Sequence, residues 1–104
     1  MRVTITGRHM TVTPALRRYL DERLRKLERY GVRPARGQVV LVVEKHRHTA
    51  EGVVTVKGRT IQGKVSTREM YASIDRLVDK IGRQLVKKKE KLVGRKLRAR
   101  RAFR

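Results

Sequence analysis

Residues 66–85, which read STREMYASIDRLVDKIGRQL, carry the clearest structural signal in the chain. Apolar residues recur there at the spacing of three and four that lines one face of an α-helix: Met70, Ile74, Leu77, Val78, Ile81 and Leu85. Ser66 and Glu69 have the spacing of a capping box, which predicts Ser66 as the N-cap. We expect the helix to run to about Val93, with Gly94 as its C-cap.

The segment ahead of this helix supplies a surface that the apolar face can cover. Runs of Val and the alternation of apolar with polar residues predict three strands: Gln38–Glu44, His48–Val56 and Ile61–Ser66. Lys57-Gly58 is typical of a tight hairpin turn in which Gly supplies the positive φ. Gly52 and Gly63 fall in the inward-facing series of their strands, so we expect something bulky to lie over them.

The amino-terminal part of the chain adds one more strand and one more helix. Met1–Thr6 alternates between apolar and polar residues, which predicts a strand with one buried face. Thr13 and Pro14 suit the N-cap and the first position of a helix that runs to about Arg29. Its apolar stripe consists of Leu16, Leu20, Leu24 and Leu27. The predicted fold is therefore α+β, in the order β-α-β-β-β-α, with a four-stranded sheet that carries both helices on one face.

Length and charge indicate a single domain with a polyanionic partner. The 104 residues are enough for one core. They contain 29 Lys and Arg against 9 Asp and Glu, a formal net charge of +20. Because self-repulsion at this charge opposes compaction, we expect the excess to serve a polyanion. We divide the chain into an α/β domain, residues 1–94, and a basic tail, residues 95–104, that we expect to be flexible.

Several classes of function lack the residues that they need. The absence of Cys removes disulfides and thiolate ligands and agrees with a reducing cytoplasm. The longest apolar run, Val39–Val43, is far too short for a bilayer span, so we expect no membrane partner. Ser66 and Ser73 stand in no nucleophile-elbow context. The histidines lack the spacing of a metal site; they are His9, His46 and His48. We therefore expect no enzyme, no metal, no cofactor and no small-molecule substrate.

Basic residues form a second stripe on the predicted second helix, beside the apolar one. They follow one another at spacings of three and four, and at 1.5 Å per residue the stripe is about 22 Å long. Its members are Arg76, Lys80, Arg83, Lys87 and Lys91. On the first helix, Tyr19, Arg23 and Lys26 flank the leucine stripe. A row of cations matches the row of phosphates along a nucleic-acid backbone.

The alternative interpretation of this stripe is an ordinary solvated helix surface. Such a surface mixes charges of both signs, whereas the stripe contains no acidic residue, which favours polyanion binding. The helix carboxylates, Asp75 and Asp79 among them, fall where salt bridges within a helix would place them. With three Tyr, one Phe and no Trp, the chain has too few aromatic residues to stack single-stranded bases. We therefore expect backbone and shape contacts with folded RNA.

The chain resembles the ribosome hibernation-promoting factor family, whose members are also called ribosome-associated inhibitors or sigma-54 modulation proteins. The resemblance extends over nearly the whole sequence. Its most specific part is Glu69–Asp75, followed by Asp79-Lys80 and Arg83–Leu85. Further matching segments are Ile5–Gly7, Val12–Arg17, Lys26–Glu28, Val43–Lys45, His48-Thr49 and Val56–Gly58.

This resemblance implies a fold similar to that of double-stranded-RNA-binding domains, and a function without catalysis. Family members bind the decoding channel of the small ribosomal subunit, block messenger and tRNA binding, and keep idle ribosomes inactive. The implied partners are the small subunit with its 16S-type rRNA, the intact ribosome and other hibernation factors. With Arg76 from the helical spacing, the family's basic positions complete the set of predicted RNA-binding residues: Arg23, Lys26, Arg76, Lys80, Arg83, Lys87, Lys88 and Lys91.

Other possibilities stay open at this point. A general RNA-binding protein or a constitutive ribosomal protein would have the same charge, and the family's older name suggests a role in transcription. Long family members continue into a second domain that dimerises ribosomes. The resemblance therefore fits either a short factor or the amino-terminal domain of a long one.

Overall fold

The structure is a computed structural model that describes the backbone of residues 2–30 and 36–101 and the side chains of residues 2–29 and 36–87. Its elements, in chain order, are β1 (Arg2–Arg8), α1 (Pro14–Arg25), the 3-10 helix η1 (Lys26–Tyr30), β2 (Arg36–Glu44), β3 (Arg47–Val56), β4 (Arg59–Thr67) and α2 (Met70–Arg101). The four strands form one sheet in the order β1-β2-β3-β4. β1 is parallel to β2, and the other two pairs are antiparallel.

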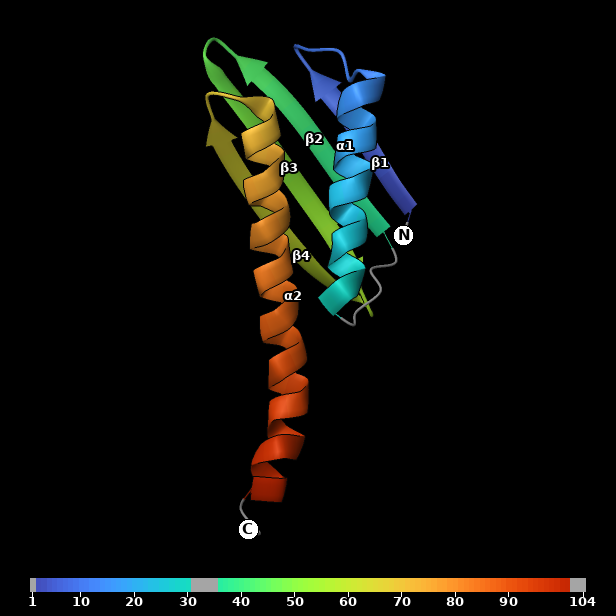
Figure 1. Ribbon diagram of the computed structural model, residues 1–104, viewed down its shortest axis with the longest axis vertical. Helices are drawn as coiled ribbons and strands as arrows, with labels where there is room; N and C mark the ends of the chain where they lie inside the picture. Colours follow the sequence, from blue (N-terminus) through green and yellow to red (C-terminus); the bar gives the residue numbers. More distant parts are fainter. Residues whose placement is uncertain (1, 31–35, 102–104) are drawn as a thin grey trace.

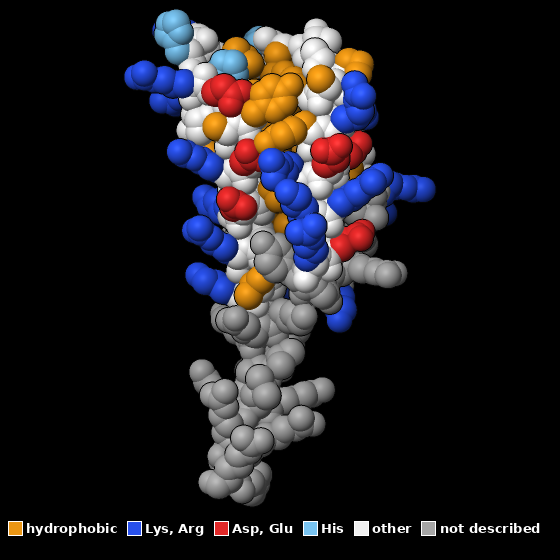
Figure 2. All heavy atoms as spheres, viewed as in Figure 1, with side chains coloured by type: hydrophobic (Ala, Val, Ile, Leu, Met, Phe, Trp, Pro, Cys, Tyr) orange, Lys and Arg blue, Asp and Glu red, His pale blue; other side chains and the backbone are white. Residues whose placement is uncertain are grey.

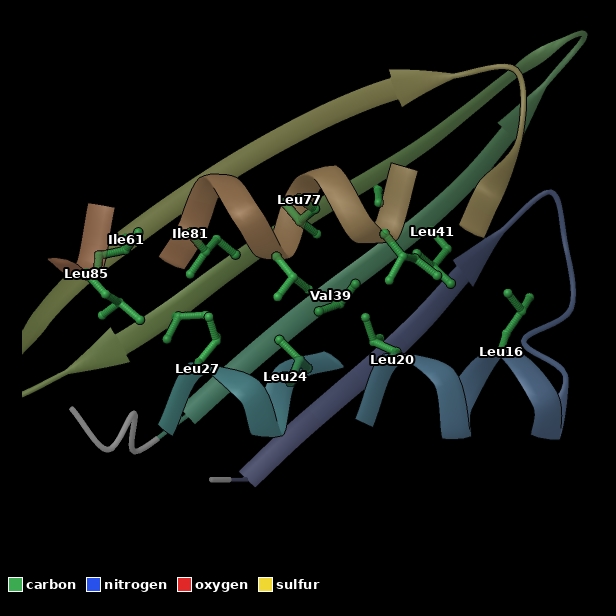
Figure 3. Close-up of a cluster of buried hydrophobic side chains, with 14 of the residues drawn as sticks. Leu16, Leu20, Leu24, Leu27, Val39, Leu41, Ile61, Leu77, Ile81 and Leu85 are labelled. Atoms are coloured by element: carbon green, nitrogen blue, oxygen red, sulfur yellow. The ribbon is translucent and has the colours of Figure 1, made fainter. Parts of the chain in front are cut away.

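Both long helices lie on the same face of this sheet, as Figure 1 shows. The predicted α+β fold and its order of elements are therefore confirmed. The core lies between the helices and the sheet, where the leucines of the first helix meet the apolar face of α2 and side chains such as Val39, Leu41 and Ile61 from the strands (Figure 3). Leu20, Leu27 and Ile81 are completely buried.

The helix α2 lies directly over a pair of glycines in the sheet. Gly52 of β3 is the register partner of Gly63 of β4. A Cβ at Gly52 would lie 3.2 Å from side-chain carbons of both Leu77 and Ile81, and one at Gly63 would lie 3.0 Å from Leu77. The prediction that a bulky group covers these glycines is confirmed, since the missing side chains let α2 approach the strands closely.

The start of α1 follows the prediction, whereas its end does not. The Thr13 side chain accepts a hydrogen bond from the backbone N–H of Leu16, with Pro14 in the first turn. The α-helix stops at Arg25, not at about Arg29, and the chain continues as the 3-10 helix η1. Because a 3-10 helix has three residues per turn, it still directs Leu27 into the core, where this residue is completely buried.

Each of the four strands extends beyond its predicted bounds at one end or both. β1 continues past Thr6 to Arg8. A Cβ at Gly7 would lie 2.7 Å from the carbonyl oxygen of Met10, so the turn after the strand leaves no room for a larger residue there. The hairpin turn between β3 and β4 agrees with the prediction, because Lys57 and Gly58 have φ values of 47° and 76°.

The prediction that Ser66 caps α2 is wrong. Ser66 belongs to β4, where it is the register partner of Thr49, and the two hydroxyl oxygens lie 2.7 Å apart. Glu69 caps the helix instead, because its carboxylate accepts hydrogen bonds of 2.9 Å from two backbone N–H groups of the first turn. The ladder with β3 keeps the chain extended as far as Thr67, which moves the start of the helix beyond the capping-box position.

The end of α2 also differs from the prediction. The helix continues through Gly94 to Arg101, so Gly94 is not its C-cap. A glycine inside a helix costs about 1 kcal/mol relative to Ala, which the good helix formers around it can offset. The 32 residues of α2 span about 48 Å at 1.5 Å per residue, and its second half extends beyond the sheet (Figure 1). The division into a domain of residues 1–94 and a flexible tail stays a prediction.

Candidate nucleic-acid interface

Four cations of the predicted basic stripe lie along one open groove between α2 and β4. All four are exposed, and the groove has a volume of about 490 Å³. The lining of this α2–β4 groove consists of Val65, Arg76, Asp79, Lys80, Arg83, Gln84 and Lys87. Gln84 ties the helix to the strand, because its side-chain amide donates a 2.9 Å hydrogen bond to the carbonyl oxygen of Gln62. The cations are thereby held at a fixed distance from the sheet.

Charge in this groove is mostly positive but not purely so. The stripe itself has no acidic member, but Asp79 lines the groove together with the cations. Within the described side chains, the one ion pair joins Arg23 to Asp75, so Lys80, Arg83 and Lys87 carry charges without an internal partner. Figure 2 shows Lys and Arg side chains along the flank of the helical face. Such unpaired cations are available to phosphates.

Arg23 and Lys26 lie in a different place, between the first helix and α2. They line a second groove of about 260 Å³ together with Asp75, Asp79, Leu27 and Val78. The structure therefore separates the predicted site residues into two clusters, a cationic one in the α2–β4 groove and one of mixed charge between the helices. Lys88 and Lys91 belong to α2, but their side chains lie outside the described ones.

A hydrogen-bonded network in the second groove joins α1 to α2. Tyr19 donates a 2.6 Å hydrogen bond to Oδ1 of Asp75. Nε of Arg23 lies 3.0 Å from the same oxygen, and Nη2 donates a 3.1 Å bond to the Tyr19 hydroxyl. The guanidinium also lies 4.9 Å from the centre of the Tyr19 ring. Tyr71, which is 39% exposed, and Tyr19 pack edge to face, with their ring centroids 4.8 Å apart.

This network raises the pKa values of Tyr19 and Arg23. The hydrogen bond to Asp75, reinforced by burial, raises the pKa of Tyr19 above its ordinary value. The hydrogen bond with Tyr19 and the charge of Asp75 raise the pKa of Arg23. At neutral pH the network therefore contains a neutral phenol and a charged guanidinium.

The interpretation of the acidic residues needs correction. The spacing predicted salt bridges within a helix, yet the ion pair of the described residues crosses between helices, from Arg23 to Asp75. Asp75 and Tyr19 were not among the predicted site residues. Their connection spans 56 sequence positions, and helical periodicity carries no information at that range.

Some structural features that other functions require are missing from the described part of the chain. Among those residues, no helix is long and apolar enough to cross a membrane. No group of three His, Asp or Glu side chains there could hold a metal ion. Of the two grooves named above, the α2–β4 groove is lined mostly by cations, which fits it to anions.

Comparisons with known proteins agree with one another. The family model described as "Sigma 54 modulation protein / S30EA ribosomal protein" matches residues 3–93. A protein of Azotobacter vinelandii named "Ribosome hibernation promoting factor" is 41% identical over 95 residues, which cover 91% of this chain and 89% of that protein. A protein of Escherichia coli with the same name is 42% identical over 92 residues, 88% of this chain and 97% of the relative.

Solved structures show the same fold. The N-terminal domain of Protein Y from Thermus thermophilus superposes with a TM-score of 0.78 at 29% identity, over 84% of this chain and 98% of that one. A structure from Coxiella burnetii described as a ribosomal subunit interface protein has a TM-score of 0.75 at 24% identity, over 86% of this chain and 98% of that one, and supports the fold alone. The family match spans nearly the whole chain. This protein therefore belongs to the Sigma 54 modulation protein / S30EA ribosomal protein family.

Proposed function

We propose that this protein is a ribosome hibernation factor. It binds the decoding channel of the small ribosomal subunit, blocks the binding of messenger and tRNA, and keeps idle ribosomes inactive. The names of the relatives with about 40% identity support the hibernation role. The decoding channel as the binding place is our inference from the family resemblance and from the charge of the surface.

The observation that carries this proposal is the row of unpaired cations in the α2–β4 groove. Arg76 and Lys87 lie eleven residues apart, which is about 16 Å along the helix axis. The row is straight, because one helix carries it, and Gln84 holds that helix against β4. A straight row of fixed cations suits a folded RNA backbone, whose phosphates are also fixed in space.

The mechanism needs no chemical step. Occupation of the channel excludes messenger and tRNA sterically, so inhibition is competitive and no bond is made or broken. Binding rests on electrostatic and shape complementarity, because phosphate contacts position a protein without reading sequence. The function requires neither a cofactor nor a small-molecule substrate.

The proposed partners follow from the same mechanism. They are the small ribosomal subunit with its 16S-type rRNA, the intact ribosome, and other hibernation factors that act on it. This places the protein in the cytoplasm, where ribosomes work. A membrane plays no part in the proposal.

A general RNA-binding protein or a constitutive ribosomal protein is the second candidate. Exposed cations outside the two grooves favour it, since Arg17, Arg18 and Arg25 of α1 are all exposed to solvent. Charge spread over several faces suits binding to many RNAs. This candidate predicts binding to translating ribosomes and to free duplex RNA, which the first does not.

Sedimentation of cell extracts separates the two functions. Extracts of growing and stationary cells are fractionated, and the protein is detected in each ribosomal fraction. We expect it on idle ribosomes and small subunits of stationary cells, and absent from polysomes. Co-migration with messenger-loaded polysomes would contradict hibernation and support the constitutive ribosomal protein.

A further inference from the structure

A second cationic hollow lies away from both grooves, where the β2–β3 turn meets the end of β4. Figure 1 shows this turn and the start of α2 at the end of the molecule opposite the C-terminus. The hollow is open and has a volume of about 630 Å³. We call it the turn hollow; its lining consists of Glu44, Lys45, His46, Arg47, Ser66, Thr67 and Arg68.

Three cations of the turn hollow carry unneutralised charge. Lys45, Arg47 and Arg68 are exposed, and the ion pair that the described residues form involves none of them. Glu44 is the one carboxylate of the lining. The neighbouring Glu69 is engaged with backbone N–H groups of the first turn of α2. Like charges that lie together without partners favour an anionic ligand.

The frame of the turn hollow is held by a buried hydrogen-bond network. Ser73 of α2 is completely buried. Its hydroxyl donates a 2.7 Å bond to the carbonyl oxygen of His48 and lies 2.7 Å from Oγ1 of Thr67. The Thr67 hydroxyl oxygen also accepts a 3.1 Å bond from the backbone N–H of Glu69. Strands β3 and β4 and the start of α2 are thus joined just beneath the cations, which makes the hollow preorganised.

The backbone of Lys45 is a second, independent feature of this hollow. Its φ of 54° lies in the left-handed region, which residues other than Gly, Asn and Asp rarely adopt. Register pairing of Glu44 with Arg47 closes the turn around it. A two-residue hairpin turn requires such a backbone, as Lys57 also shows in the β3–β4 turn, so the turn gives Lys45 a defined place at the hollow.

We propose that the turn hollow is a second phosphate-binding site, which takes phosphates of the ribosomal RNA backbone. This inference rests on the proposed function and extends its footprint. Arg68 precedes Lys87 by nineteen positions, and the 17 steps from Met70 to Lys87 alone rise about 26 Å along α2. A small anion cannot engage both places at once, whereas a folded RNA can. The open shape of the hollow suits a backbone phosphate on a large surface.

Three matched triple variants test this inference. The turn-hollow variant is Lys45→Asn, Arg47→Gln and Arg68→Gln; Asn accepts a positive φ, so the turn is preserved. The groove variant is Lys80→Gln, Arg83→Gln and Lys87→Gln. The control variant is Arg18→Gln, Arg25→Gln and Arg29→Gln, three exposed cations on the first helix and η1. Each variant lowers the net charge by three.

The measurement is equilibrium binding to purified small ribosomal subunits over a series of KCl concentrations. We expect the turn-hollow variant to bind at least about tenfold more weakly than the control variant, and its plot of log affinity against log salt to be shallower by about 2. Circular dichroism checks the fold. If the triple variant does not fold, Arg68→Gln alone against Arg18→Gln alone repeats the comparison, with a slope change of about 0.7 expected.

The outcomes separate this inference from the proposed function. If the turn-hollow variant binds like the control variant while the groove variant binds weakly, the inference is overturned and the proposed function stands. If the wild-type protein does not bind small subunits at all, the proposed function fails. If both the turn-hollow and groove variants bind weakly relative to the control variant, both are supported.

Discussion

Asp75 places a negative charge in a surface that we propose binds RNA phosphates. Its Oδ1 accepts a hydrogen bond from the Tyr19 hydroxyl and forms an ion pair with Nε of Arg23, so it fixes one edge of the guanidinium. A guanidinium has five N–H donors, and those that the network does not use stay available to a phosphate. We therefore expect Asp75 to position Arg23, with little net repulsion of RNA.

The change Asp75→Asn tests this positioning role. Loss of the negative charge alone would strengthen binding to small subunits, whereas loss of the positioning of Arg23 would weaken it. If Asp75 positions Arg23, the variant binds small subunits about three- to tenfold more weakly although it removes a negative charge. Asp79→Asn is the matched control, since Asp79 lines the same groove without a hydrogen bond to Arg23, and it should bind equally or more tightly. In an Arg23→Ala background the effect of Asp75→Asn should disappear. Equal tightening by both Asn variants would contradict the role.

The raised pKa of Tyr19 predicts how stability depends on alkaline pH. The folded-state pKa of Tyr19 lies above the unfolded value of about 10. The contribution of its hydrogen bond to the stability of the fold is therefore complete below pH about 10 and is lost as pH rises through the folded-state pKa. Thermal unfolding of wild type and Tyr19→Phe between pH 8 and 11 measures it. We expect the gap in Tm between the two proteins to shrink above pH about 10. A gap that stays constant would show that the network does not couple to this phenol.

The sequence predicts which cations on a helix are exposed, but it does not predict which distant side chains form hydrogen bonds or ion pairs with one another. Helical spacing places Lys80 and Arg83 beside the apolar face, where the structure finds them exposed. The same spacing says nothing of Asp75 and Tyr19, which meet because α1 and α2 pack against each other. Long-range hydrogen bonds depend on how elements pack, and a local pattern contains no information about that.

At the scale of elements, α2 is positioned by the two glycines beneath it. Leu77 and Ile81 lie so close to the sheet that a Cβ at Gly52 or Gly63 would force a neighbouring side chain to shift by a few tenths of an ångström. This contact determines how far the basic flank of α2 stands from β4. The α2–β4 groove therefore depends on residues that face away from it.

Substitution of Gly63 by Val should destabilise the fold by about 1–3 kcal/mol, because added methyl groups in a packed core force neighbours to shift. Gln62→Val is the matched control, since the exposed Gln62 lies on the opposite face of the same strand; it should be neutral or slightly stabilising through strand propensity. Urea unfolding of both variants gives the free energies. A Gly63→Val protein as stable as wild type would mean that α2 can move away from the sheet without loss.

The kinds of element were predictable, and some of their ends were not. Apolar periodicity correctly indicated both helices and all four strands, because burial of one face imposes it. The ends depend on competition between elements. Ser66 has the side chain of a helix cap, but pairing with Thr49 keeps it in the strand. Gly94 is a good helix terminator, yet α2 continues through it.

At the scale of the whole molecule, the protein is elongated, with principal extents of 57, 24 and 19 Å. Among the described side chains, Leu85 is the last core residue of α2. The second half of that helix projects beyond the sheet (Figure 1). The sequence of residues 95–104 is rich in Arg and contains no acidic residue. Such a segment adds charge at one end of the molecule and suits long-range steering toward a polyanion.

Deletion of residues 95–104 should mainly slow association with small subunits and reduce its salt dependence, since steering acts on the association rate. The fold should persist, because the buried core residues of the described part of the chain lie between Leu16 and Leu85. Stopped-flow binding at two salt concentrations measures the rate, and thermal unfolding checks the fold. A fall in Tm of more than a few degrees would show that the segment contributes to the domain.

We propose that a specific cationic surface, not total charge, silences the ribosome. The most direct measurement is an in vitro translation titration with two triple Ala variants at one salt concentration. Lys80, Arg83 and Lys87 are replaced in one, and Arg18, Arg25 and Arg29, which are equally exposed, in the other. Both variants should stay folded, because Ala is the best helix former. We predict that the first inhibits translation far more weakly than the second, by about tenfold or more in the concentration required. Equal losses would show that only total charge matters and would contradict the α2–β4 groove as the binding surface.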